Sequence, residues 1–311
     1  MIDTLSASQH SSPSSARLGR YDGAANVDDL DALIADNPPL PKLQILGYAR
    51  DDADRMAQIV MRFTALLIRA HPFLSFDALE CMVIGADYRT ALSLYEEEGR
   101  AFDMDFFDSA TTSLGIVLPT QRGVVTFIHL QVIDHLQADS PQSWASAIRV
   151  FWHELCHIHD VGLRRKWLLR RARARQEDGI LYRNCDGLWS EYFANRFSYF
   201  NGADLSDDWR RLELLLEHMP RMEPAPAADK LASTFGYLLG SLSAQRTDLH
   251  NLRPDIVQRL RMRGLMAAWL EAGTATDDLI QSQDCWHHEK GVMRLAVAAR
   301  LIENACKFGS R

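Results

Sequence analysis

The sequence predicts an α+β fold that is predominantly helical, and three observations support this prediction. Two β-rich runs, at residues 115–118 and 124–130, flank a short segment that includes Pro119 and Gly123, which is the pattern of a hairpin. Helical periodicity governs most of the chain after residue 140. The 311 residues are 47% hydrophobic and 24% charged, as expected for a globular protein with a sizeable core.

The first 110 residues divide into a predicted leader, residues 1–40, and a predicted N-terminal helical region, residues 41–110. The leader is rich in Ser, Ala, Asp and Pro and lacks sustained periodicity, so we expect it to be flexible. A helix is predicted from Asp51 to about His71, because apolar residues recur on one stripe at helical spacing. The stripe consists of Met56, Ile59, Val60, Phe63 and Leu67. Between Phe73 and Phe107 the signals are mixed, with an apolar run at 81–84 and an acidic, helix-like stretch at 96–98, so the topology of this segment stays open.

Two helices are predicted after the hairpin. Ser140-Pro141 is typical of a helix start, and we expect this helix to end near Gly162. A basic stretch at 164–175 and a turn-rich passage separate it from the second helix, which is predicted from Leu188 to a stop at Asn201-Gly202. The C-terminal region, residues 204–311, is helical by pattern, with expected helices at 206–219, 229–243, 254–271 and 291–307.

Charge and cysteine content exclude several classes of protein. The formal charge of −7 argues against a general affinity for nucleic acid or anionic membranes. The five cysteines are scattered and lack a close C-x-x-C pair, which fits neither a disulfide framework nor a four-cysteine zinc module. The first 20 residues lack the apolar core of a secretory signal, and no run of 18 apolar residues occurs. We therefore expect a soluble, cytoplasmic protein with no membrane partner.

The stretch His153-Glu154-Leu155-Cys156-His157 is the strongest functional motif in the chain. Two histidines four residues apart on a helix project from the same face, so both imidazoles can bind one ion. Zinc lowers the pKa of its bound water towards neutrality, and Glu154 points beside the ion to take the proton and pass it to a leaving amine. Chance would produce such a pattern in on the order of one per cent of chains of this length. The motif predicts zinc-dependent hydrolysis of a peptide or amide bond.

Catalytic zinc needs a third protein ligand, for which Glu191 is the candidate. The metzincin continuation of the motif is excluded, because Asp160 and Leu163 stand where that class has Gly and His. Asn195 lies four residues after Glu191 on the second predicted helix, where it is placed to hydrogen-bond a ligating histidine. A solvated helix carboxylate is the alternative interpretation of Glu191. Asp160 is expected to support the ligands or to be a polar residue near the end of its helix.

At these residues the sequence resembles the gluzincin-type zinc metallopeptidases, whose HExxH helix is completed by a glutamate from a second helix. Within that group it looks most like the ImmA/IrrE-type metallopeptidases of bacteria and phages, which share the E-x-x-A-N-x-F form seen here from Glu191 to Phe197. The resemblance covers about residues 115–202. It implies a zincin-like core, residues 111–203, with a small sheet and an active-site helix, flanked by helical regions. It also implies a strand that pairs with an extended peptide, for which residues 124–130 are the candidate and an ordinary core strand is the alternative.

Several further residues have more than one interpretation. The candidates for stabilising the oxyanion that forms on attack are Tyr182, Tyr192, Tyr199 and His159, and no spacing rule chooses among them. Cys156 suits packing between helices better than a redox role. The basic stretch is either a solvated helix face or a contact for phosphate or an acidic substrate. A second metal at Cys285, His287 and His288 is less expected than surface polarity, because adjacent histidines on a helix point apart.

We therefore predict a zinc metallopeptidase that binds one Zn²⁺ ion and acts on a protein or peptide substrate. In this prediction His153, His157 and Glu191 hold the ion, and Glu154 is the general base. The alternative is a non-catalytic regulator or sensor with a zincin fold, whose helical C-terminal region binds a protein partner. A DNA-linked regulator is a third hypothesis, but the sequence shows no clear helix-turn-helix pattern, so nucleic acid is not an expected partner.

Overall fold

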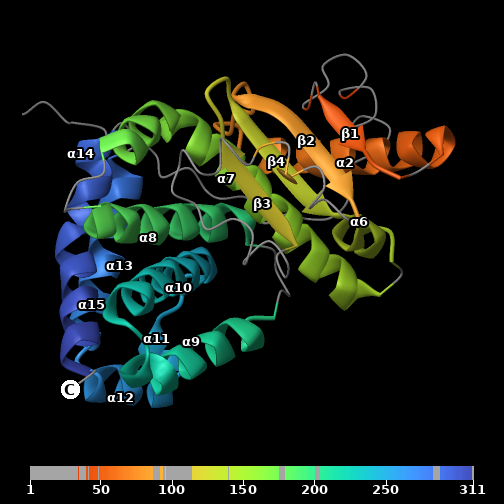
Figure 1. Cartoon of the computed structure of the whole chain (residues 1–311). Helices are drawn as coiled ribbons and strands as arrows, with labels where there is room; N and C mark the ends of the chain where they lie inside the picture. The colour runs from red at the N-terminus through yellow and green to blue at the C-terminus, as the bar shows by residue number, and fades with distance from the viewer. Residues whose placement is uncertain are drawn as a thin grey trace, which may run out of the picture.

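The computed structural model is a predominantly helical α+β fold with one small mixed sheet (Figure 1). It describes residues 34, 40, 42–47, 49–86, 92, 93, 95, 114–138, 140–174, 179–199, 204–282 and 288–309. The predicted leader, residues 1–40, therefore lies outside the described residues except at Ile34 and Leu40, and so does the acidic stretch at 96–98.

The sheet has the strand order β1-β2-β4-β3. Its strands are β1 (Leu43–Ile45), β2 (Leu79–Gly85), β3 (Gly115–Pro119) and β4 (Val124–His129). β2 pairs in parallel with both β1 and β4, whereas β3 and β4 pair antiparallel, with Val117 opposite Thr126. The predicted hairpin is confirmed, and β3 forms one edge of the sheet.

The prediction of a helical region at 41–110 requires correction, because this segment supplies β1 and β2 as well as a helix. The apolar run at 81–84 is the middle of β2 and is buried on both faces. A strand buried on both faces is a continuous apolar run without alternation, which local pattern does not distinguish from a buried helical segment.

Three helices, α2 (Arg50–Ala70), α6 (Leu130–Leu136) and α7 (Pro141–Ala174), pack against the sheet. α2 and the start of α7 agree with the predictions, whereas the predicted end at Gly162 is wrong. A Cβ atom at Gly162 would lie 2.6 Å from the Cβ of Ala78, so this glycine allows α7 to pass close to the segment before β2. The basic stretch at 164–175 is, up to Ala174, the continuation of α7.

The remaining helices form the other half of the molecule (Figure 1). They are α8 (Gly179–Ser198), α9 (Ser206–His218), η1 (Met219–Arg221), α10 (Pro224–Gln245), α11 (Leu249–Leu252), α12 (Pro254–Met262), α13 (Met266–Gln281), α14 (Glu289–Val292), η2 (Met293–Leu295) and α15 (Ala296–Gly309). α8 begins at Gly179 and not at 188. Gly187 lies inside this helix, where a Cβ would lie 2.8 Å from the Ser233 Oγ. The predicted stop at Asn201-Gly202 lies outside the described residues.

The helix predicted at 254–271 is two helices, α12 and α13. Gly264 separates them with a φ of +68°, a conformation that favours glycine and ends a helix. One buried core runs through both halves of the molecule, from Met82 and Ile128 of the sheet to Ile302 of α15. No helix in the described ranges is long and apolar enough to cross a membrane.

Candidate metal centre

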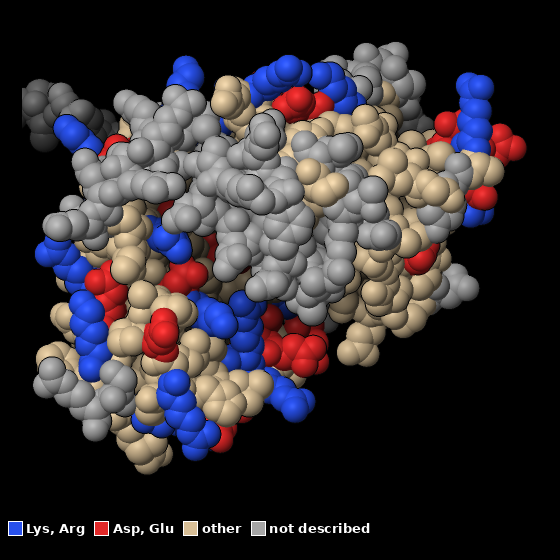
Figure 2. Space-filling view, viewed as in Figure 1, with Lys and Arg blue, Asp and Glu red and all other residues tan. Residues whose placement is uncertain are grey.

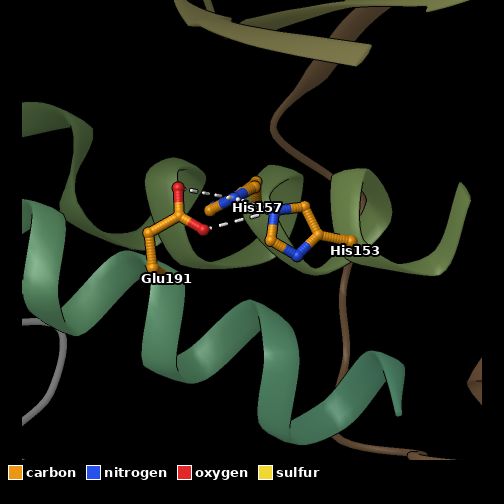
Figure 3. A group of neighbouring side chains, drawn as sticks. All are labelled: His153, His157 and Glu191. Carbon is orange, nitrogen blue, oxygen red and sulfur yellow. Dashed lines mark hydrogen bonds and ion pairs between the residues drawn. The ribbon is translucent and has the colours of Figure 1, made fainter. Parts of the chain in front are cut away.

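His153, His157 and Glu191 lie together between α7 and α8 (Figure 3). One ligand atom from each of the three side chains lies within 4.8 Å of the other two. The two histidine Nε2 atoms are 2.9 Å apart, and the Glu191 carboxylate oxygens lie 3.5 Å from the Nε2 of His153 and 3.9 Å from that of His157. The group can therefore hold a metal ion. The side chain of Glu191 is 27% exposed, so the group is open to solvent on one side.

The hydrogen bonds of His157 place the lone pair of its neutral ring on Nε2, the atom that faces His153 and Glu191. Its Nδ1 lies 3.0 Å from the Oγ of Ser190, and Ser190 donates its own proton to the Oδ2 of Asp160, also at 3.0 Å. The Ser190 oxygen must then accept from the Nδ1 of His157, which puts the proton of the neutral ring on Nδ1. Burial lowers the pKa of His157 to about 4, so the ring is neutral at pH 7. A neutral imidazole with a free Nε2 is the form that binds a metal.

Ser190 is hydrogen-bonded to a buried network of charged residues. Asp160 accepts a hydrogen bond from the Trp189 Nε1 at 2.9 Å, and it forms an ion pair with Arg164, which also pairs with Asp186. Burial raises the pKa of Asp160, but the charge and hydrogen bonds of Arg164 outweigh this effect and hold that pKa below its usual value. Asp160 thus supports His157 through Ser190, without contacting the ring directly.

Replacing Ser190 with alanine is expected to weaken metal binding by about 10–100-fold, because the Nδ1–H of His157 loses its acceptor and the ring loses its fixed orientation. Competition with a chromophoric chelator measures the affinity. Ser146→Ala, at an exposed position of the same helix α7, is the matched control and should leave the affinity unchanged. Equal affinities in the two variants would show that other contacts orient His157.

Glu154 lies beside this group and against β3. The residue is 8% exposed, and burial, reinforced by the charge of Glu191, raises the pKa of Glu154 to about 8. A Cβ at Gly115 would lie 2.3 Å from the Glu154 Cγ, so only glycine at this position of β3 leaves room for the glutamate. The outer edge of the sheet therefore runs alongside Glu154.

Two glycines of α10 set the position of Glu191. A Cβ at Gly236 would lie 2.1 Å from the main-chain oxygen of Leu188 and 3.1 Å from the Cβ of Glu191. A Cβ at Gly240 would lie 2.4 Å from the main-chain oxygen of Tyr192. The backbones of α10 and α8 therefore touch at the turn that carries the third ligand.

Comparison with family models, curated proteins and solved structures gave no match for this chain. The assignment of a function rests on the geometry of the site.

Besides Ser190, the sequence did not predict Tyr237 and Arg149 at the site. The ring of Tyr237, on α10, lies against the ring of His153 with the centroids 5.6 Å apart, and the Arg149 guanidinium lies 5.0 Å from the Tyr237 ring centre. Burial raises the pKa of the Tyr237 hydroxyl, so it remains a proton donor at neutral pH. Arg149 is held by Asp208 of α9 at 2.7 Å. Arg149 lies four residues before His153 on α7, so helical spacing could have predicted that it lies near the site. No such spacing relates Tyr237 to the motif.

The predicted hydrogen bond from Asn195 to a ligating histidine is not formed. The Nδ2 of Asn195 donates to the main-chain oxygen of Glu191 at 2.9 Å, four residues back on the same helix. Among the described residues, the Oδ1 of Asn195 and the Nδ1 of His153 are both buried without a hydrogen-bond partner. Asn195 thus braces the helical turn of Glu191 and does not orient a ligand.

Three of the four oxyanion candidates lie away from the metal group. The Tyr192 hydroxyl donates to Asp277 of α13 at 2.7 Å, because adjacent residues on a helix point about 100° apart and Glu191 takes the metal side. The ring of His159 stacks on Phe193, and its Nδ1 accepts from the Ser75 main-chain N–H at 2.9 Å. Tyr182 lies about 13 Å along α8 from Glu191. Tyr199 lies near Arg149; burial raises the pKa of its hydroxyl, and the Arg149 charge offsets part of that rise.

The candidate strand for peptide pairing is also corrected. β4 lies between β2 and β3 and has no free edge, so the alternative of an ordinary core strand holds for residues 124–129. Leu130 belongs to α6. Cys156 is fully buried, and burial followed by the charges of Asp160 and Glu154 raises the pKa of its thiol, in agreement with a packing role. Cys285 and His287 lie outside the described residues.

Proposed function

We propose that this protein is a zinc-dependent peptidase. The convergence of two imidazoles and one carboxylate from α7 and α8 carries the proposal, because this donor set is the one that catalytic zinc uses when a fourth position is kept for water. The neutral, Nδ1-protonated form of His157 fits zinc as well. Glu154, which follows the first ligand directly, adds the base that hydrolysis requires.

A bound zinc ion would supply Lewis acidity that activates water and polarises the peptide carbonyl. In the proposed mechanism Glu154 takes a proton from the attacking water and returns it to the leaving amine, and its burial against Gly115 fixes where that proton is held. Tyr237, protonated and packed on His153, is assigned the hydrogen bond to the developing oxyanion. The edge of β3 beside Glu154 is assigned to pair with the extended substrate backbone.

Replacing Glu154 with glutamine tests the proposal. We expect cleavage of a randomised peptide mixture to fall by about 10²–10⁴-fold, because the general base is lost. Zinc content, measured by mass spectrometry of the purified protein, should stay at one ion per chain, since Glu154 is not assigned as a ligand.

Glu217→Gln is the matched control, since Glu217 is exposed on α9, and it should retain both zinc and cleavage. Wild-type protein without stoichiometric zinc would overturn the metal assignment. Stoichiometric zinc with no cleavage of any peptide or candidate protein would instead favour a regulator that uses the metal structurally.

A further inference from the structure

A cavity of about 360 Å³ opens between α9 and α10. Its lining includes Arg210, Arg211 and Lys230 as cations, Asp207 as the one carboxylate, and Leu215 and Met222 as apolar residues. Over α9, Figure 2 shows Lys and Arg atoms beside Asp and Glu atoms, so the surface there is of mixed charge. The excess of positive over negative side chains is therefore found in the lining of the cavity and not over the whole surface of α9.

Contacts connect this cavity to the metal centre. His153 packs on Tyr237, Tyr237 lies under Arg149, and Arg149 binds Asp208 of α9 at 2.7 Å. Arg211 follows Asp208 by three residues and therefore lies on the same face of α9, about 4.5 Å farther along the axis. Asp207 and Arg211, on either side of Asp208 in α9, both line the cavity, so the cavity lies next to the residue that binds Arg149.

The residues of α10 also connect the metal centre to the cavity. Lys230 and Tyr237 are seven residues apart on α10, which places them on one face with about 10 Å between them along the axis. Tyr237 packs on His153 and Lys230 lines the cavity, so one face of α10 borders both the metal centre and the cavity.

The cavity cations differ from the other arginines near the site. Arg149, Arg164 and Arg253 are each bound to carboxylates. In the part of the chain that the structure describes, Arg210, Arg211 and Lys230 form no salt bridge or side-chain hydrogen bond. These three residues are exposed, and cations that form no salt bridge within a cavity are available to an anionic ligand. A guanidinium fits a carboxylate with two parallel hydrogen bonds.

We propose that this cavity binds a carboxylate of the peptide substrate, from an acidic side chain or from the free C-terminus, and so selects where the chain is cut. This inference rests on the proposed peptidase function. An extended peptide advances about 3.3 Å per residue, so a span of about 10 Å places the carboxylate two or three residues from the cleaved bond.

Cleavage of a randomised peptide mixture by the zinc-loaded protein, with the products read by mass spectrometry, is the first measurement. We expect Glu or Asp at one position, two or three residues from the cleaved bond. For matched peptides carrying Glu or Gln there, kcat/KM should favour Glu by about 10-fold or more, because a hydrogen bond to a charged group is stronger than one to an amide. Loss of the preference on C-terminal amidation would identify the terminal carboxylate as the bound group.

Substitutions of Arg211 assign the preference to the cavity. Arg211→Met should bring the Glu-to-Gln ratio of kcat/KM close to one. Arg211→Glu should prefer a matched peptide with Lys at this position over the Glu peptide. Arg261→Met, which removes an exposed cation of α12 outside the cavity, should keep the wild-type ratio. A wild-type ratio near one, or a ratio that Arg211→Met leaves intact, would overturn the proposal.

Binding separates failure of this inference from failure of the proposed function. Fluorescence anisotropy of the Glu and Gln peptides on zinc-loaded Glu154→Gln reports the carboxylate site without turnover. Tighter binding of the Glu peptide that Arg211→Met abolishes would support the site even if no peptide were cleaved, and the proposed hydrolysis alone would then fail. Cleavage without any acidic preference would support the peptidase and reject the carboxylate site.

Discussion

Replacing Arg164 with methionine is expected to lower the free energy of unfolding by about 3–5 kcal/mol. Arg164 is 1% exposed, and its guanidinium binds the carboxylates of Asp160 and Asp186. Methionine replaces part of the buried volume but leaves Asp160, which is only 3% exposed, without its cation. A buried charge without a partner costs far more than an ion pair on the surface contributes. Urea unfolding of the metal-free protein at pH 7 measures the change.

Lys166→Met removes an exposed cation two residues farther along α7 and should change the stability by less than about 0.5 kcal/mol. Adding Asp160→Asn to Arg164→Met should recover part of the loss, because the uncompensated charge is then removed. An Arg164→Met variant as stable as Lys166→Met would contradict the role assigned to the network.

Replacing Glu191 with glutamine is expected to abolish stoichiometric zinc binding while the metal-free protein becomes more stable at pH 8. Glutamine keeps the shape of the side chain but lacks the anionic ligand. In the metal-free protein burial raises the pKa of Glu191 to about 7 from its ordinary value of 4.5. A carboxyl with a raised pKa stabilises the fold fully below pH 4.5, and this contribution is lost as the pH rises through 7. The neutral glutamine avoids that loss.

Thermal unfolding with chelator and with excess zinc measures both effects. A zinc concentration of 1,000 times the Kd stabilises a binding-competent protein by about 4 kcal/mol, so the wild-type midpoint should rise with zinc and that of Glu191→Gln should not. Glu217→Gln should behave as wild type in both conditions. A zinc-dependent rise in Glu191→Gln equal to that of the wild type would remove Glu191 from the ligand set.

The histidine pair was predictable from sequence because its geometry is local, since the spacing of His153 and His157 places both on one helix face. Glu191 lies on a second helix, and the E-x-x-A-N-x-F form from Glu191 to Phe197 indicated it. Ser190 was not predicted, because its contact with His157 depends on the rotation of α8 about its own axis. Tyr237 comes from a third helix, and no spacing rule relates α10 to the motif.

The fold was predictable where local and tertiary preferences agree, as in the hairpin and α2. The predicted helix ends were wrong near two glycines, because a glycine often follows the end of a helix but here permits close packing within one. Gly162 and Gly187 both lie inside helices, next to Ala78 and Ser233. The parallel pairing of β2 with β4 joins segments that are distant in sequence, so local periodicity does not report it.

Contact between the backbones of α8 and α10 makes the metal centre sensitive to substitution at the two glycines of α10 that permit this contact. Gly236 and Gly240 bring main chain against main chain at Leu188 and Tyr192, so the spacing of the two helices sets the position of Glu191. One added methyl group at residue 236 or 240 pushes the two helices apart, and with them the carboxylate from the histidines. Amino-acid substitution in this protein is therefore tightly constrained at Gly236 and Gly240, although neither residue has a side chain.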